Sequence, residues 1–288
     1  MSTLWKEIQI KMLHSGSKLN LLIGINILVF LLVNITSTFT KLFFHSDIID
    51  YFDLEYLRLP ASLHKLLTHF WTPITYMFMH ADIWHILMNM LWLYWFGQIF
   101  EEFLGKKRTL GLYLMGGFSG AFFFVFFYNV LPFYTQLHVA DSSTLVGASA
   151  GVMAVMVATA TQLPDYTISL ILIGPVRLKW LVLFFILIDF LGITSANAGG
   201  ELSHLGGALI GFIYIKQLQK GSDWIAGIAS VFKPRPKMKV VSSNPSGRSS
   251  GAPRQEEIDL ILDKISRSGY DSLTKQEKEI LFRASNEG

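Results

Sequence analysis

The chain has 288 residues, of which 51% are hydrophobic and only 16% are charged, and its mean hydropathy is +0.42. This composition excludes an ordinary soluble domain and is typical of a protein that crosses a membrane several times. The net charge of +3 gives no reason to expect a nucleic-acid partner. The absence of cysteine excludes disulfides, thiolate metal sites and cysteine nucleophiles.

Six apolar stretches are predicted to form membrane-spanning helices. They cover residues 19–38, 77–100, 110–131, 148–163, 180–193 and 202–215. The long loop at 39–75 is rich in aromatic residues, including Tyr56 and Trp71, which argues against disorder. Two further apolar runs, 168–173 and 224–232, are too short to span and are expected at the interface.

Basic residues near the ends of these stretches indicate how the chain is oriented. They follow the second, fourth and sixth stretches, at positions 106–108, 177, 179, 216 and 220. The connections at 132–146 and 194–201 contain neither lysine nor arginine. We therefore expect a multi-pass protein of the cell membrane, specifically the bacterial inner membrane, with both termini in the cytosol.

The composition divides the chain into four parts. Residues 1–18 are predicted to be a cytosolic N-terminal segment, 19–220 the membrane domain, 221–254 a flexible linker rich in Ser, Gly and Pro, and 255–288 a small helical tail. In the tail, Thr274 and Glu277 fit a capping box. The pattern does not say what the tail does, and an unknown partner is one possibility.

Polar side chains within apolar spans are costly and by default indicate function. Those here are His85 and Asn89 in the second stretch, Ser149 at the start of the fourth, Asp189 in the fifth and His204 in the sixth. Measured from the cytosolic ends at about 1.5 Å per residue, all but Asp189 lie at roughly 18–24 Å, close to one level.

These four residues match the requirements of acyl-transfer chemistry. Ser149 supplies a nucleophile and His204, on another helix, a general base. His85 and Asn89 are four residues apart on one helix face and supply donors for an oxyanion. A serine–histidine pair without an orienting acid must obtain control of its tautomer elsewhere. We interpret Asp189 as a hydrogen-bonded structural carboxylate rather than as a catalytic acid.

The surroundings of Ser149 also fit helix packing alone. Gly147 and Gly151 are four residues apart, a spacing that lets membrane helices approach closely. However, about 16 residues cannot cross about 30 Å of hydrocarbon, so Ser149 is predicted to begin below the surface. Either residues 132–146 dip in above it or water fills the gap, and hydrolysis needs that water.

Three motifs in order resemble those of rhomboid intramembrane serine proteases of the bacterial type, with a six-helix core, over residues 71–212. They are His80-x-x-x-x-His85-x-x-x-Asn89, Gly147-Ala148-Ser149 and His204-Leu205-Gly206-Gly207-Ala208. The resemblance implies that Ser149 is the nucleophile, His204 the base, and His85, Asn89 and the Ser149 backbone N–H the oxyanion donors. It implies a structural role for His80 and close packing of the sixth helix on the fourth through Gly207 and Gly211.

The chain departs from the family pattern in three places. Ala150 follows the serine, where the family commonly has glycine. Met153 replaces an aromatic residue that often lies under the histidine, which leaves the orientation of His204 less supported. The chain has Trp71-Thr72 where Trp-Arg is common, and Glu101-Glu102-Phe103 where Glu-x-Arg is common, so we expect the first loop to be held differently.

Together these features predict an all-α polytopic membrane protein, a six-transmembrane-helix rhomboid-like bundle plus a small cytosolic helical tail. The predicted activity is serine endopeptidase cleavage in or near transmembrane segments of membrane proteins through a Ser–His dyad, in the lipid bilayer and without cofactor or metal. The alternative is a catalytically silent rhomboid-like protein that binds membrane helices, although the presence of Ser149 and His204 argues against it. A transporter using His85, Asp189 and His204 as a relay is disfavoured because no internal repeat is evident.

Overall fold

The computed structural model describes residues 17–170, 173–231 and 255–286. Residues 1–16 of the predicted N-terminal segment and 232–254 of the predicted linker lie outside these ranges. The chain divides into two compact units, residues 1–233 and 234–288. Each unit is described by itself.

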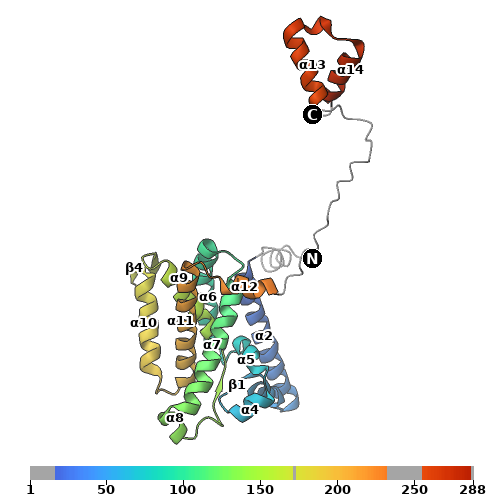
Figure 1. The fold of residues 1–288 in the computed structure, drawn as a ribbon. Helices are drawn as coiled ribbons and strands as arrows, with labels where there is room; N and C mark the ends of the chain where they lie inside the picture. The colour runs from blue at the N-terminus through green and yellow to red at the C-terminus, as the bar shows by residue number, and fades with distance from the viewer. Residues whose placement is uncertain (1–16, 171–172, 232–254, 287–288) are drawn as a thin grey trace. The chain divides into compact units, whose positions relative to one another are not determined.

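Long helices bundled side by side make up the first unit (Figure 1). They are α2 (Lys18–Phe44), α6 (Ile83–Leu104), α7 (Thr109–Val130), α9 (Ser149–Gln162), α10 (Leu178–Gly192) and α11 (Ala198–Gln219). Each overlaps one predicted stretch, but α6 begins later than the apolar run suggests. The reason is Asp82, whose carboxylate accepts hydrogen bonds from the backbone N–H groups of Trp84 and His85 at 2.8 and 2.9 Å and so caps α6.

Within the described ranges, α2 and α7 are the two helices that length and composition alone allow to cross a membrane. Helices α9 and α10 have only 14 and 15 residues. Helices α6 and α11 have 22 residues each but carry polar side chains such as His85 and Glu201. The structure therefore establishes a mostly helical bundle, and the count of six spans stays a prediction.

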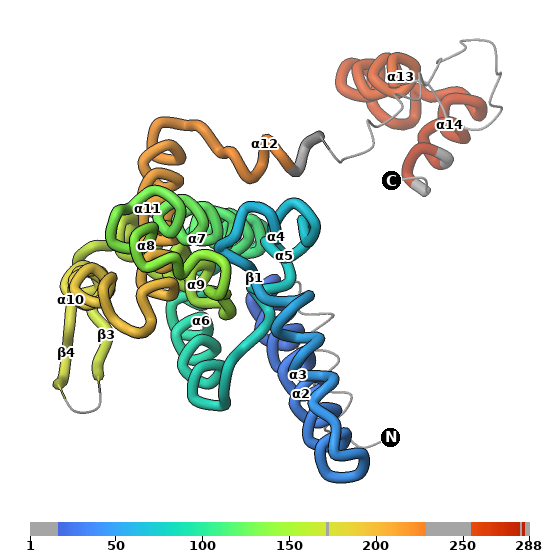
Figure 2. Tube along the Cα trace, turned by 90° about the horizontal axis from the view of Figure 1, so that it is seen from below, coloured from blue at the N-terminus to red at the C-terminus, as the bar shows by residue number. Residues whose placement is uncertain are grey.

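Helix α9 lies at the centre of this bundle, in contact with α6, α7, α10 and α11 (Figure 2). Every residue from Ala150 to Ala160 is buried. The predicted glycine face of α11 is confirmed: a Cβ atom at Gly207 would lie 2.1 Å from the carbonyl oxygen of Ala150, and one at Gly211 would lie 2.3 Å from that of Ala154. Only glycine permits this approach of backbone to backbone.

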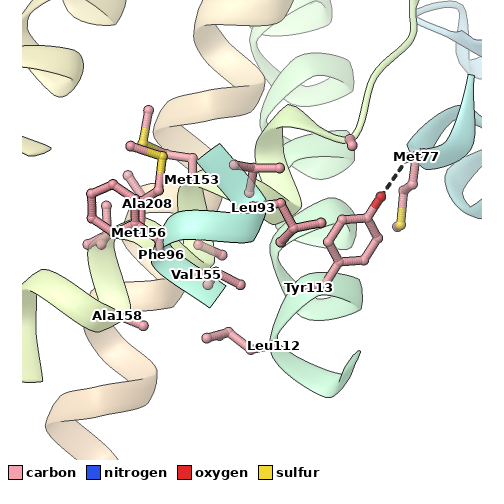
Figure 3. Packing of buried hydrophobic residues seen from close by; sticks show 14 of the residues in the cluster. Met77, Leu93, Phe96, Leu112, Tyr113, Met153, Val155, Met156, Ala158 and Ala208 are labelled. Carbon is pink, nitrogen blue, oxygen red and sulfur yellow. Dashed lines mark hydrogen bonds between the residues drawn. The ribbon is translucent and has the colours of Figure 1, made fainter. Parts of the chain in front are cut away.

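The other side of α9 packs against α7. A Cβ atom at Gly151 would lie 2.8 Å from the carbonyl oxygen of Tyr113, so this glycine has the packing role that its spacing suggests. Tyr113 lies in the buried apolar cluster and donates a hydrogen bond from its hydroxyl to the carbonyl of Met77 at 2.7 Å (Figure 3). The core thus reaches from α9 through α7 to the chain just before α6.

The segment between α2 and α6 is ordered, as its aromatic content predicts. It contains α3 (Ile48–Phe52), a π-helix (Asp53–Leu57), β1 (Leu59–Pro60), α4 (Leu63–Thr68), α5 (Thr72–Thr75) and a 3-10 turn (Tyr76–Phe78). The Trp71 indole donates to the carbonyl of Tyr56 at 2.8 Å, and Arg58 pairs with Asp53 at 2.5 Å. These contacts hold the loop where the Trp-Arg pattern is missing.

Strand β1 pairs antiparallel with β2 (Thr144–Leu145), placing Leu59 opposite Leu145. This short ladder ties the first loop to the residues that lead into α9. Short helix α8 (Pro132–Gln136) precedes β2. Both paired leucines are buried in the core, so the ladder connects the first loop with the core beside the start of α9.

Glu101 near the end of α6 joins three helices. Its carboxylate accepts from the Ser17 hydroxyl at 2.7 Å, from the Leu19 backbone N–H at 3.0 Å and from the Thr109 hydroxyl at 3.0 Å. Helices α2, α6 and α7 are thus joined by one acid, although the Glu-x-Arg pattern is absent.

The described residues of the two apolar runs that are too short to span a membrane, 168–173 and 224–232, lie in different kinds of secondary structure. In the first, strands β3 (Thr167–Leu170) and β4 (Gly174–Arg177) pair antiparallel, with Ile168 opposite Val176. The glycine and proline in this segment, with alternating exposure, favour strands over a helix. Helix α12 (Trp224–Val231) follows α11.

The second unit contains α13 (Gln255–Ser268), a 3-10 turn (Tyr270–Ser272) and α14 (Lys275–Asn286). The predicted capping box is confirmed. The Thr274 backbone N–H donates to Glu277 Oε2 at 2.7 Å, and the Glu277 N–H donates to Thr274 Oγ1 at 3.3 Å. Lys264 of α13 donates to Glu277 at 2.9 Å and so links the two helices.

Candidate active site

A cavity of about 260 Å³ lies between α6, α9, α10 and α11. Its lining includes the four residues that sequence analysis singled out for acyl transfer, together with Met153 and Asp189. The full set is His85, Met88, Asn89, Trp92, Val146, Ser149, Val152, Met153, Met156, Phe185, Asp189, Asn197, Gly200 and His204. A larger apolar hollow of about 510 Å³ lies between α6 and the β3–β4 hairpin, but no histidine lines it.

Ser149 is the first residue of α9 and is partly exposed. Because it opens the helix, its backbone N–H has no acceptor within the helix. The N-terminal end of a helix also carries partial positive charge, which stabilises a negative group placed there. The position therefore suits both a nucleophilic hydroxyl and a donor to an oxyanion.

Gly147 gives the loop before Ser149 its shape. It has a φ of +130°, a conformation that favours glycine, and its N–H donates to the carbonyl of Tyr76 at 2.9 Å. A Cβ atom at Gly147 would lie 2.9 Å from His85 Nε2 and 3.4 Å from Ser149 Oγ. The glycine thus leaves room for the His85 ring beside the serine and does not have the helix-packing role that its spacing also allowed.

The hydrogen bonds of His85 assign its tautomer. Its Nδ1 accepts from the Ala81 backbone N–H at 3.4 Å, so in the neutral ring the proton is on Nε2, the nitrogen that faces Gly147. Asn89 is buried and donates one amide N–H to the carbonyl of His85 at 2.9 Å, which leaves its second N–H for another acceptor. Both side chains are donors beside the serine.

His80 lies outside the cavity lining. Its ring is 8% exposed and packs 5.2 Å, centroid to centroid, from the ring of His85. Neither ring nitrogen has a hydrogen-bond partner among the described residues. Contact with His85 fits the structural role that the resemblance implies, which stays a prediction.

His204 on α11 is hydrogen-bonded to Asp189, the carboxylate that the sequence predicts to be structural and hydrogen-bonded. Its Nδ1 lies 2.9 Å from Asp189 Oδ1, and the more distant Glu201 Oε2 is 3.8 Å away. Met153 is buried in the cavity wall, one turn along α9 from Ser149. The structure describes both Ser149 and His204 and contains no hydrogen bond between them. Hydrogen bonds of this kind are often long in enzymes without bound substrate.

One group of three side chains within the described ranges could hold a metal ion, namely Asp189, Glu201 and His204. Their ligand atoms lie within 4.8 Å of one another. A metal ion bound to His204 Nδ1 would use the lone pair of that nitrogen, so the ring proton would be on Nε2. The hydrogen bond to Asp189 needs the opposite tautomer, with the proton on Nδ1. Metal binding there and use of Nε2 as a base therefore exclude each other.

These observations define a helical bundle with a polar serine–histidine cavity inside apolar surroundings. Residues 67–220 match the Rhomboid domain family, which covers more than half of the chain. The chain belongs to the rhomboid family, which is embedded in membranes. Residues 249–287 match a second family, of unknown function (DUF6576).

Several curated relatives share the rhomboid region. RHOMBOID-like protein 12, mitochondrial, of Arabidopsis thaliana is 34% identical over 157 residues, 52% of this chain and 47% of the relative. Presenilin-associated rhomboid-like protein A, mitochondrial, of Danio rerio is 28% identical over 145 residues, 48% of this chain and 35% of the relative. Rhomboid protein 1, mitochondrial, of Saccharomyces cerevisiae is 27% identical over 146 residues, 48% of this chain and 38% of the relative.

The chain thus spans less than half the length of each of these relatives. All three names carry the word mitochondrial. They support a membrane protein of the rhomboid family, but not the expectation of a bacterial type or of a bacterial inner membrane.

Proposed function

We propose that the protein is an intramembrane serine endopeptidase that hydrolyses peptide bonds in or near transmembrane segments of membrane proteins. The observation that carries the proposal is the meeting of Ser149, His204, His85 and Asn89, from three helices, at one cavity. These groups supply a nucleophile, a base and oxyanion donors. Family membership supports the same chemistry.

In the first step, Ser149 Oγ attacks the scissile carbonyl carbon while its proton passes to His204 Nε2. The carbonyl electron pair moves onto oxygen, and the oxyanion accepts hydrogen bonds from His85 Nε2, the Asn89 amide and the Ser149 N–H. The carbon–nitrogen bond then breaks, and His204 gives its proton to the leaving amine. An acyl-enzyme on Ser149 remains.

In the second step, water attacks the acyl carbon and loses a proton to His204 Nε2. The bond between Ser149 Oγ and the acyl carbon breaks, and the histidine returns the proton to Oγ. The new carboxyl end of the substrate leaves. No cofactor or metal takes part in this scheme.

The membrane arrangement is part of the proposal. Six helices cross the bilayer, both chain ends lie on the cytosolic side, and Ser149 lies toward the opposite side. The short α9, of 14 residues or about 21 Å, then starts below the surface, where water reaches the cavity. Substrates are single-span proteins that unwind locally, since a peptide bond in a regular helix is hard to reach.

The test is cleavage of a reporter with a type I transmembrane segment in liposomes. The intact protein is compared with Ser149→Ala, His204→Ala and, as control, Ser142→Ala, an exposed serine before β2. We expect the first two substitutions to abolish cleavage and the control to keep it. Cleavage by Ser149→Ala would refute the proposal.

A protein that only binds membrane helices gives a different result. If no variant cuts the reporter, Ser149 is exposed to a fluorophosphonate probe. Labelling of the intact protein but not of His204→Ala supports an enzyme with another substrate. Failure to label points to the catalytically silent alternative.

A further inference from the structure

We propose that Asp189 is a positioning residue of the proposed catalytic pair, holding the His204 ring in the orientation and tautomer in which Nε2 can accept the proton of Ser149. The inference rests on the proposed function. It assigns the carboxylate of α10 a role in the reaction instead of a role in helix packing alone.

The geometry of Asp189 points to one target. Its side chain is only 8% exposed, and Oδ1 lies 2.9 Å from His204 Nδ1. Its other oxygen, Oδ2, is buried without an N–H or hydroxyl donor among the described residues. The carboxyl of Glu201 is a further hydrogen-bonding neighbour of Asp189. Among the described residues, the nitrogen donor to Asp189 is His204.

The contact decides which nitrogen of His204 is free. A carboxylate oxygen only accepts hydrogen bonds, so Nδ1 must carry the proton that it donates. In the neutral ring, Nε2 then has the lone pair, and His204 lines the cavity that also contains Ser149. When the ring gains the proton of Ser149, the same carboxylate faces the positive imidazolium, which it stabilises.

The pair also replaces a support that the chain lacks. Met153 occupies the position on α9 where the family often has an aromatic residue under the histidine. A flexible thioether restrains a ring poorly, because it has three rotatable bonds and no hydrogen-bond donor. In this chain the restraint comes from α10 instead of α9, as a directional hydrogen bond.

Glu201 is the natural rival for this role, and its geometry is weaker. Its Oε2 is 3.8 Å from His204 Nδ1, beyond hydrogen-bond distance, and its Oε1 accepts from the Asn197 amide at 3.1 Å. The titratable groups that face His204 are therefore Asp189 from α10, Glu201 from its own helix and His85 from α6. Of these, Asp189 makes the hydrogen bond.

The experiment uses the full chain in liposomes, with Asp189→Asn and the matched pair Asp189→Glu and Asp189→Gln. The measurements are the rate of fluorophosphonate labelling of Ser149, and kcat and KM for the reporter. We expect Asn and Gln to lower kcat by about 10²- to 10⁴-fold with little change in KM. Glu retains the charge and is expected to label faster than Gln, which has the same size.

The Glu and Gln variants separate positioning from packing. The two side chains have the same size, so a packing defect would lower kcat and the labelling rate of both alike. Positioning through the hydrogen bond at His204 Nδ1 predicts instead that the charged Glu variant keeps a higher kcat than the Gln variant at a similar KM.

Two results would overturn the inference. One is an Asp189→Asn protein in which Ser149 is labelled at the wild-type rate and kcat for the reporter is unchanged. The other is equal slowing of the Glu and Gln variants with equally lowered unfolding temperatures. Failure of the proposed function looks different, because Ser149→Ala would then keep the cleavage activity.

Discussion

Replacing Gly207 with alanine tests whether the contact between α11 and α9 sets the distance between His204 and Ser149. Gly207 and His204 are three residues apart on α11 and share one face. Opposite them on α9, Ala150 follows Ser149 directly. A change at Gly207 therefore acts beside the reacting pair without removing any functional group.

The size of the effect follows from the distances. A Cβ atom at Gly207 would lie 2.1 Å from the Ala150 carbonyl oxygen and 2.8 Å from its carbonyl carbon, whereas ordinary contacts begin at 3.4 Å. Since both neighbours are backbone atoms, α11 must move away by about 1 Å, and overpacking of this kind costs about 1–3 kcal/mol. A displacement of about 1 Å between reacting groups lowers rates by about 10²-fold.

The assay is fluorophosphonate labelling of Ser149, alongside thermal unfolding in the same detergent. The control is Gly227→Ala in α12, where a Cβ atom would have nothing within 4 Å. We expect Gly207→Ala to slow labelling by about 10²-fold and to unfold at lower temperature, while the control keeps both values. Labelling of Gly207→Ala at the control's rate would show that backbone contact does not set the site geometry.

Three further predictions address the oxyanion donors, metal dependence and the tail. Gly147→Ala introduces a Cβ atom 2.9 Å from the His85 ring, at a residue whose φ is +130°. Because His85 is then displaced, kcat is expected to fall by about 10²- to 10³-fold with KM nearly unchanged. A selective rise in KM would contradict this. EDTA is expected to leave cleavage unchanged and added Zn²⁺ to inhibit it through His204 Nδ1; loss of activity in EDTA would refute the metal-free scheme. In the tail, the Lys264 ammonium and then Thr274 lower the pKa of Glu277 from 4.5 to about 2, so its stabilising contribution is present above pH 4.5 and lost as the pH falls through about 2. Carboxyl NMR of the full chain is expected to show a higher pKa in Lys264→Met, and titration of wild-type Glu277 near 4.5 would disprove the pairing.

Much of the helical bundle could be predicted because apolar length is a local property of the sequence. The predicted span 148–163 and the observed helix α9 differ by one residue at each end. The agreement is close because Gly147 before the helix and Pro164 after it both disfavour its continuation. The start of α6 was missed because Asp82 is a polar residue within an apolar run. Reading Asp82 as an N-cap ahead of Trp84 and His85 would have placed that start correctly.

The β3–β4 hairpin was missed for a different reason. Periodicity cannot distinguish a short apolar strand from a short helix, and only the Gly174-Pro175 turn signal favours strands. Strands β1 and β2 have two residues each and pair across more than 80 positions, so no local pattern predicts them.

The residues of the candidate site were found by their chemistry, because polar groups are rare in such apolar helices. The hydrogen bond between Asp189 and His204 was not predicted. Asp189 and His204 lie on different helices, and the rotation of α10 about its own axis decides whether the carboxylate faces the ring or the lipid. That rotation is set by packing along the whole helix, which no single motif encodes.

Two independent contacts thus act on one imidazole ring. Gly207 sets how closely α11 approaches the start of α9, and Asp189 sets which nitrogen of His204 is free, from a third helix. A shift of α10 relative to α11 would break the hydrogen bond between Asp189 and His204 and leave the packing of Gly207 on α9 intact. The base can therefore be disabled without separating α9 from α11. Both contacts serve the same proton transfer, so the combined loss of labelling rate in the double variant Gly207→Ala, Asp189→Asn is expected to be smaller than the product of the two single losses. Once the His204 ring is displaced from Ser149, its tautomer has less effect on the rate.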